Sequence, residues 1–114
     1  MEWTQLTSLN QLEKIKEESK DRHIVIFKHS TSCYISKMVL NGFESNLPYD
    51  QLNDAYSFYF LDLIKYRSVS NKIAEDFNVR HESPQLIVIK DSIAVHNSSH
   101  SSISVEEMLT HSAR

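Results

Sequence analysis

The side chain best suited to covalent chemistry in this sequence is the thiol of Cys33, the only cysteine among 114 residues. A single cysteine cannot form a disulfide within its own chain, and a zinc site built from cysteine pairs is excluded as well. Cys33 follows the β-branched and aromatic run His23–His29 and three residues that favour the start of a helix, Ser30–Ser32. A sulfur at a helix N-terminus lies among unpaired backbone N–H groups, which favour its thiolate form. Such a thiolate attacks disulfides and is also readily expelled from them, so the position predicts thiol–disulfide exchange.

Polar neighbours of this thiol are candidates for supporting roles. Ser36 shares a helix face with the cysteine, so its hydroxyl either donates a hydrogen bond to the sulfur or faces solvent. Thr31 and Ser32 are expected to support the turn into the helix. Lys28 and His29 would add positive potential, although the pleat of a strand turns one of the two away. Inert packing of the thiol is the alternative, because free cysteines are commonly buried.

A second polar segment, His81–Gln85, precedes a short apolar run that is typical of a strand. Pro84 is compatible with an ordinary turn before that strand. In the strand order expected below, however, this loop faces the start of the helix that carries Cys33. A cis proline at this position would leave neighbouring backbone groups free to pair with an extended substrate chain.

The apolar pattern divides the chain into the strands and helices that position these groups. Capping boxes at Ser8/Gln11 and Ser104/Glu107 mark the first and last helices. The short gap between the last two strands requires an antiparallel hairpin. The strands are expected at Trp3–Leu6, His23–His29, Tyr56–Leu61, Leu86–Ile89 and Ile93–Val95, and the helices from Leu9 to about Asp21, from Cys33 to Leu47, over Val69–Phe77 and after Ser104.

The order β-α-β-α-β-α-β-β-α predicts an α/β fold: a mixed five-stranded sheet flanked by helices, in the thioredoxin-like arrangement. One such domain over residues 1–114 accounts for the whole chain. We expect the strand Tyr56–Leu61 in the centre of the sheet, buried on both faces, and the hairpin Leu86–Val95 at one edge. On the second helix, one apolar face is expected to hold Ile35, Met38, Val39, Gly42 and Phe43.

Composition argues against several classes of partner. The net charge is −3 and the 12 lysines and arginines are scattered, which argues against nucleic acid or an anionic membrane surface. No apolar run approaches the length of a membrane span, and the N-terminus lacks the basic and apolar regions of a signal peptide. We therefore expect a cytoplasmic protein. A metal site from His96 and His100, together with His111, is an alternative, although the Ser-rich stretch there is typical of a polar loop.

The segments around both polar sites resemble the monothiol bacilliredoxin (YtxJ-like) family of the thioredoxin superfamily. The Cys-x-x-Ser element joined to His-Glu-Ser-Pro-Gln at this separation carries most of the resemblance. The departures are Tyr34 where the family usually has proline, and Ser32 where it has arginine. The matching segments are Phe27–Cys33, Ile35–Ser36, Val69–Asn71, Ile73–Ala74 and Val79–Gln85.

The resemblance implies a reductase for mixed disulfides between proteins and bacillithiol or a similar small thiol. Cys33 would be the catalytic residue, and Ser36 stands where dithiol relatives hold the resolving cysteine. Tyr34, Ser83 and Pro84 would bind substrate. The resemblance also implies a cis peptide bond between Ser83 and Pro84. The implied partners are S-thiolated proteins, the small thiol as co-substrate and a disulfide reductase, with no tightly bound cofactor.

Two other functions remain open at this stage. One is a redox-inactive thioredoxin-fold module that binds a protein partner through aromatic surface such as Tyr34. The other is a thiol peroxidase, which is disfavoured because no Thr/Arg arrangement that would activate a peroxide surrounds Cys33.

Overall fold

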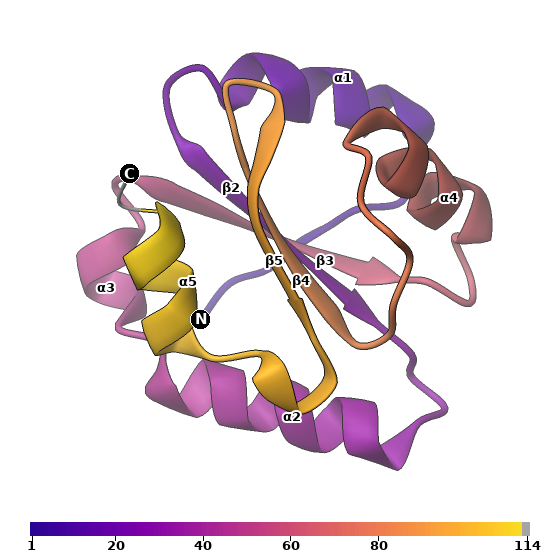
Figure 1. Ribbon diagram of the computed structural model, residues 1–114, viewed down its shortest axis with the longest axis vertical. Helices are drawn as coiled ribbons and strands as arrows, with labels where there is room; N and C mark the ends of the chain where they lie inside the picture. Colours follow the sequence, from indigo (N-terminus) through magenta and orange to yellow (C-terminus); the bar gives the residue numbers. More distant parts are fainter. Residues whose placement is uncertain (113–114) are drawn as a thin grey trace.

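Two groups of helices cover opposite faces of a five-stranded sheet in the computed structural model, which describes residues 1–112 (Figure 1). The predicted α/β class and mixed sheet are confirmed. The strands are β1 (Thr4–Gln5), β2 (His23–His29), β3 (Tyr56–Asp62), β4 (Gln85–Lys90) and β5 (Ile93–Ser99). The helices are α1 (Leu9–Glu18), α2 (Tyr34–Asn46), α3 (Tyr49–Leu52), α4 (Arg67–Asp76) and α5 (Val105–Ser112), with a 3₁₀ turn, η1 (His100–Ser102), before the last.

The sheet has the order β1-β3-β2-β4-β5, in which β2 is the middle strand. The prediction that Tyr56–Leu61 is central was therefore wrong by one position, although β3 is an interior strand. Its outer neighbour β1 pairs with only two of its residues, Tyr59 and Phe60, and these stay half-buried. β2, in contrast, is apolar and buried on both faces from Ile24 to Phe27, as a middle strand has to be. The hairpin β4–β5 is antiparallel and lies at the edge, as predicted.

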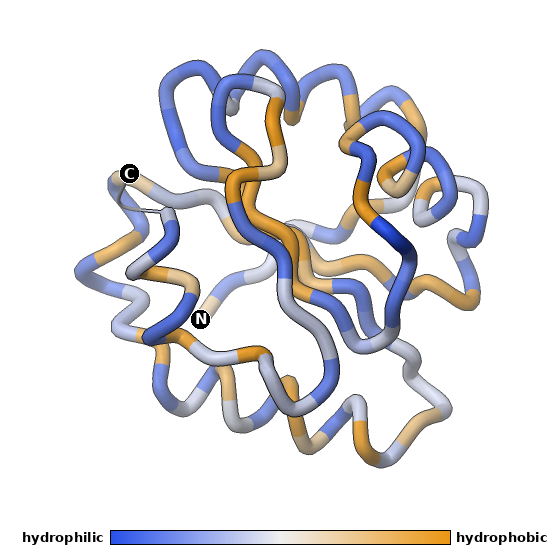
Figure 2. Tube along the Cα trace, viewed as in Figure 1, coloured by the Kyte–Doolittle hydropathy of each residue, from blue (hydrophilic) through white to orange (hydrophobic). Residues whose placement is uncertain are grey.

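Alternate side chains of β2 enter two separate cores. Ile24 and Ile26 belong to the core under α1 and α4, whereas Val25 and Phe27 belong to the core under α2 and α5. Apolar residues accordingly concentrate along the central strands, and polar residues on the outer loops (Figure 2). This alternation matters for the site, because the next two residues of β2 are polar and also point to opposite faces.

Local geometry sets several boundaries of these elements, and one of them, the capping box at the start of α1, was predicted. The capping box of Ser8 and Gln11 begins α1, although Leu9 in its first turn is exposed. Asn78, after α4, has φ 52°, the left-handed conformation expected of a residue that ends a helix. The hairpin turn uses Asp91 and Ser92 at φ 53° and 62°, the positive values that match a two-residue turn to the strand twist.

The expected apolar face of α2 was wrong in part. Phe43 is buried as expected, but Ile35 and Met38 are 64 % and 57 % exposed, and the helix buries Ser36 instead of them. Apolar residues lie on both sides of this helix, so periodicity alone did not identify the buried one. The short α3 and η1 were not predicted. Within residues 1–112, no helix has the length and apolar character needed to span a membrane.

Candidate active site around Cys33

Cys33 is the N-cap residue of α2, at the point where the chain leaves the middle strand and begins a helix. Its backbone is extended, with φ −104° and ψ 118°, and its N–H donates to the carbonyl of Ser30 at 3.1 Å. The sulfur makes no capping hydrogen bond, and the residue is half-buried. The thiol is therefore accessible and lies where helix N–H groups have no internal partner. This is the environment in which a thiolate is useful as a nucleophile and as a leaving group.

Ser36 lies one turn into α2 and is fully buried. Its Oγ is 2.7 Å from Nδ1 of His29 and accepts the Ser30 N–H at 3.3 Å. Within the described residues, no hydrogen bond joins Ser36 to the sulfur of Cys33, and Ser36 does not face solvent either. The serine instead ties the beginning of α2 back to the end of β2.

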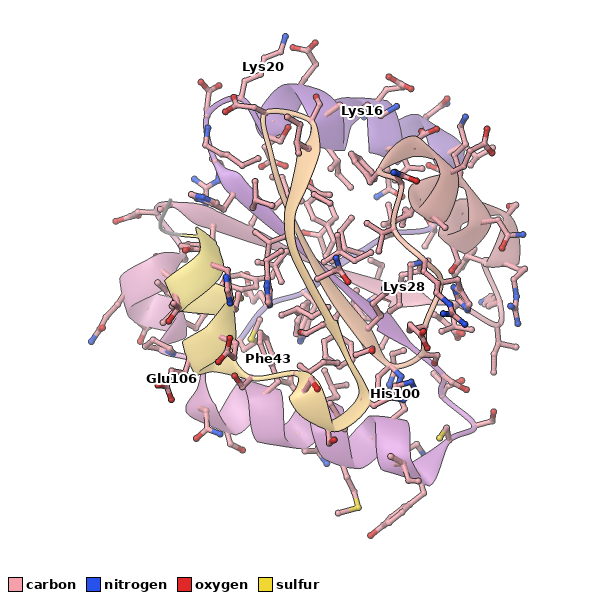
Figure 3. All side chains as sticks on the ribbon, in the orientation of Figure 1. Lys16, Lys20, Lys28, Phe43, His100 and Glu106 are labelled. Atoms are coloured by element: carbon pink, nitrogen blue, oxygen red, sulfur yellow. The ribbon has the colours of Figure 1, made fainter. Side chains whose placement is uncertain are left out.

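The two polar residues that end β2 point to opposite faces of the sheet. Lys28 is 0 % exposed and lies beside the segment that joins α4 to β4, with Nζ 3.4 Å from Nδ1 of His81 (Figure 3). His29 is 4 % exposed and points toward α2. Burial lowers the pKa of His29 below its ordinary 6.5, with Asp62 opposing the shift, so the ring is neutral at pH 7. The positive potential expected from these two residues therefore does not come from His29.

The loop before α2 is polar and open to solvent. Thr31 and Ser32 are exposed, and Ser32 shares a hydrogen bond of 3.3 Å with the hydroxyl of Ser30. Tyr34, immediately after the cysteine, is 74 % exposed. Together with the exposed side chains of Ile35 and Met38, it forms an apolar surface beside the thiol.

The Ser83–Pro84 segment lies at the carboxyl end of β2, the end from which the chain continues to Cys33. β4 runs antiparallel to β2 with Lys28 opposite Gln85, so continuing this register places Pro84 beside the last residue of β2. The Ser83–Pro84 peptide bond is cis. The carbonyl of Pro84 accepts the N–H of His100 at 3.0 Å, so it is not available to a substrate. Within residues 1–112, the backbone of Ser83 has no hydrogen-bond partner.

A second tie holds this loop to the end of β5. Nε2 of His100 lies 3.2 Å from Oε2 of Glu82, and the Arg80 guanidinium lies 3.7 Å from the other carboxylate oxygen. On the opposite side, Gln85 donates to the carbonyl of Arg80 at 2.9 Å. These bonds hold the segment in place. The contact between His100 and Glu82 was not predicted, because the two residues are separated in sequence by a complete hairpin.

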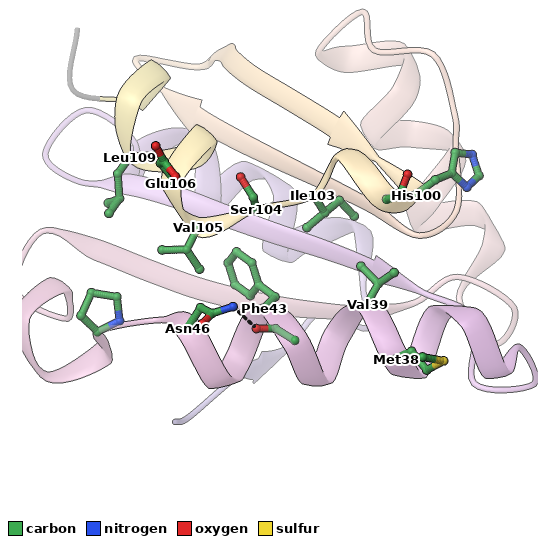
Figure 4. Close-up of a pocket in the computed structure, with 13 residues that line it drawn as sticks. Met38, Val39, Phe43, Asn46, His100, Ile103, Ser104, Val105, Glu106 and Leu109 are labelled. Carbon is green, nitrogen blue, oxygen red and sulfur yellow. Dashed lines mark hydrogen bonds between the residues drawn. The ribbon is translucent and has the colours of Figure 1, made fainter.

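A groove of about 720 Å³ lies between α2 and the η1–α5 segment (Figure 4). Its walls are mostly apolar, with Met38 and Phe43 from α2 facing Ile103 and Leu109. Gly42 lines the groove with no atom within 4 Å of where a Cβ would lie. Sequence reasoning did not find this groove, because it depends on how α5 is placed over α2.

The histidine-based metal site receives no support from residues 1–112, in which no three His, Cys, Asp or Glu side chains are grouped as metal ligands. The rings of His96 and His111 stack at 4.9 Å with an angle of 5° between them. His100 is instead paired with Glu82 in the loop beside Pro84. The three histidines therefore do not converge.

Comparisons with known proteins agree with this geometry. Residues 4–108 match the family described as Monothiol bacilliredoxin BrxC. A solved structure described as a candidate oxidoreductase with a thioredoxin fold is 32 % identical, with a TM-score of 0.80 over 96 % of this chain and 92 % of that one. Two thioredoxins share the fold at lower identity. That of Malassezia sympodialis (Mala s 13) has 17 % identity and a TM-score of 0.73 over 98 % and 90 % of the two chains. The thioredoxin of Fasciola hepatica has 20 % identity and a TM-score of 0.70, over 96 % of this chain and 97 % of that one.

The fold, the thiol at the start of α2 and the family match over residues 4–108 lead to the same conclusion. The chain has a thioredoxin-like fold and belongs to the monothiol bacilliredoxin family.

Proposed function

We propose that this protein is a monothiol oxidoreductase that removes a small thiol from S-thiolated proteins through Cys33. The observation that carries the proposal is the placement of the only thiol of the chain, half-exposed and uncapped, at the first turn of α2. A helix N-terminus favours the thiolate in both directions of exchange, as the attacking and as the departing group.

The proposed reaction has two steps. The Cys33 thiolate attacks the sulfur of the small thiol in a protein mixed disulfide, and that disulfide bond breaks. The protein thiolate leaves and takes a proton from water, while Cys33 carries the small thiol as a new mixed disulfide. A second molecule of small thiol, or a partner reductase, then attacks this disulfide and regenerates the Cys33 thiolate. The net change is reduction of the client, balanced by oxidation of the second thiol.

The second thiol has to come from another molecule, because Ser36, at the position of a resolving cysteine, is a buried hydroxyl that cannot attack a disulfide. Among the substrate-contacting candidates, Tyr34 offers exposed apolar area. Ser83 offers a backbone that has no hydrogen-bond partner within residues 1–112, in the segment that precedes β4. Pro84 contributes by shape, since its carbonyl is occupied. Thr31 and Ser32 serve the loop that presents Cys33.

Bacillithiol or a close analogue is the proposed small thiol, and the cytoplasm is the proposed compartment. A lone reduced cysteine suits a compartment in which thiols stay reduced. S-thiolated proteins and a disulfide reductase are the proposed macromolecular partners, and no tightly bound cofactor is required by the two steps above.

The test is intact-mass spectrometry of the protein after incubation with an S-bacillithiolated client. The expected product is Cys33 carrying one bacillithiol, with release of the client thiol and no transfer to Cys33→Ser. Parallel reactions with glutathione and coenzyme A mixed disulfides identify the preferred small thiol. If no mixed disulfide forms at Cys33 with any of the three, the proposal fails and a redox-inactive binding module becomes the better account.

A further inference from the structure

Lys28 is a buried cation without a counter-ion. Its side chain is 0 % exposed, and within residues 1–112 it forms no ion pair with a carboxylate. The ammonium group instead donates to the carbonyl of Ser70 at 3.3 Å and to Nδ1 of His81 at 3.4 Å. Buried charges in proteins are normally paired, so this cation lacks the partner that burial ordinarily requires.

The contact with Lys28 determines which nitrogen of His81 carries the ring proton. An ammonium group only donates, so Nδ1 is the acceptor and the proton of the neutral ring lies on Nε2. Burial, Lys28 and Arg67 lower the pKa of His81 while Glu82 opposes the shift, so the ring is neutral at pH 7. Within residues 1–112, Nε2 makes no hydrogen bond and is not one of the buried unpaired atoms. This N–H is therefore open to solvent.

Arg67 adds an exposed guanidinium beside this ring. It is the first residue of α4 and lies three residues before Ser70, a spacing that places the two side chains on one face of the helix. The hydroxyl of Ser70 lies 3.3 Å from Nδ1 of His81. Within residues 1–112 Arg67 forms no ion pair, and Glu82, the carboxylate that acts on the ring, is already paired with Arg80. The positive charge here is thus not balanced by the described residues.

We propose that Arg67 and His81 form a subsite for a carboxylate of the small thiol, with Lys28 as the positioning residue behind it. The guanidinium and the Nε2–H both donate, and a carboxylate accepts from both. Lys28 acts through His81, because it holds Nε2 as the donor and adds positive charge. The inference rests on the proposed function in assigning the carboxylate to the small thiol.

The subsite and the thiol lie at the same end of the sheet. Lys28 is next to the last residue of β2, and His81 is two residues before Ser83, whose backbone has no partner within residues 1–112. Lys28 points to the face covered by α4, whereas the exposed apolar side chains beside the thiol, such as Tyr34, belong to α2 on the other face. An apolar surface suits the protein client, which leaves the charged side to the small thiol.

The first test is binding of succinate, a dicarboxylate without a thiol, to Cys33→Ser at constant ionic strength, followed by NMR. Succinate is expected to shift the Nε2–H signal of His81 and to raise the pKa of Lys28, and the uncharged succinamide to do neither. Arg67→Gln should weaken succinate binding about two- to fivefold. The matched control, Lys72→Gln, removes the same charge from the same helix, but from a cation paired with Asp76 at 2.9 Å, and should leave binding unchanged. Equal effects of succinate and succinamide, or of the two variants, overturn the proposal.

The pH dependence separates the role of Lys28 from a merely structural one. Lys28 loses its proton around a pKa of about 8, whereas an arginine and a glutamate, the other charged groups that act on His81, ordinarily do not titrate between pH 7 and 9.5. The dissociation constant for succinate is expected to rise about two- to fivefold over this range and to stay constant in Lys28→Met. A constant value in the unsubstituted background, or a ring proton on Nδ1 of His81 at pH 7, overturns the proposal.

The last test connects the subsite to exchange. A model client peptide carries either mercaptosuccinate or 2-mercaptoethanol as the small thiol, and intact mass follows its transfer to Cys33. Arg67→Gln is expected to slow transfer of mercaptosuccinate about two- to fivefold and to leave 2-mercaptoethanol unchanged. Equal losses with both thiols, or a preference that follows an acidic residue of the peptide instead, overturn the proposal. Failure of every transfer would overturn the proposed function and leave the succinate results standing.

Discussion

Replacing Lys28 by methionine is expected to make the protein more stable at neutral pH. The ammonium group is 0 % exposed and has two long hydrogen bonds, 3.3 Å to the carbonyl of Ser70 and 3.4 Å to Nδ1 of His81. Burial lowers the pKa of Lys28 from 10.5 to about 8. A difference of about 2.5 pKa units between the folded and unfolded states corresponds to roughly 3 kcal/mol by which folding disfavours the charged form.

The net gain from Lys28→Met is smaller than that cost. Loss of two long hydrogen bonds offsets about 1 to 2 kcal/mol. The partners do not become orphans, because His81 keeps the hydroxyl of Ser70 at 3.3 Å. Methionine has a similar length and fills the same space. We therefore expect the free energy of unfolding at pH 7 to rise by about 1 to 2 kcal/mol.

The pH dependence gives the sharper test. Because the pKa of Lys28 is lower in the folded state, its contribution to stability is unfavourable below pH 8 and improves as the pH rises from 8 to 10.5. The advantage of Lys28→Met over the wild type should thus shrink by roughly 3 kcal/mol across that interval.

Urea unfolding, followed by fluorescence of the single tryptophan, Trp3, measures the stability difference at each pH. The difference in the free energy of unfolding between the variant and the wild type removes the contributions of groups that titrate alike in both proteins. Lys14→Met, at an exposed position on α1, is the control and should change stability by less than about 0.5 kcal/mol at every pH. The reasoning is refuted if Lys28→Met is less stable at pH 7, or if its difference from the wild type is the same at pH 7 and pH 10.

Three further predictions concern stability and use the same unfolding assay. Gly42→Ala should stabilise by about 1 kcal/mol, since a Cβ meets no atom within 4 Å and glycine is unfavourable inside a helix; destabilisation would show that the groove it lines has to stay open. Tyr56→Phe should cost about 1 to 2 kcal/mol by removing its buried hydrogen bond with Ser112; an unchanged stability would mean that water replaces the bond. Burial lowers the pKa of both His23 and His29, so the folded state favours their neutral form. The free energy of unfolding should therefore be highest above about pH 6.5 and fall below that pH by up to about 1.4 kcal/mol per pH unit for each ring. A constant free energy of unfolding between pH 6.5 and 5 would contradict this.

The sequence was sufficient to predict most of the elements, because their signals are local. Capping boxes, the run Ile24–Phe27 and the short hairpin gap depend on neighbours within a few residues. Strand order is different, because it depends on which strand adds to which side of the sheet. β4 and β5 both add on the β2 side, whereas β1 alone adds on the β3 side, so β2 becomes the middle strand. No local pattern encodes that choice.

Cys33 could be predicted from the sequence, but the contacts made by the residues around it could not. Cys33 was identified because a strand followed by helix-starting residues is a local signal. The burial of Ser36 was missed because its partner His29 belongs to a different element, and because exposed Ile35 and Met38 suggested the opposite face of α2. The contact between His100 and the loop at Pro84 requires the hairpin to bring the two together, so it became visible only in the structure.

The fully buried polar residues of the middle strand lie at its carboxyl end. Val25, Ile26 and Phe27 are buried and apolar, and Lys28 and His29, which follow, are equally buried and polar. Buried polar groups cost stability unless they are paired, so a core built for stability alone would continue the apolar run. Both exceptions lie at the carboxyl end of the strand, directly before the loop that presents Cys33. Natural proteins break the apolar pattern of a core mainly at functional sites. Here polar residues replace apolar ones on both faces of the sheet, at the end of the strand that leads to the thiol.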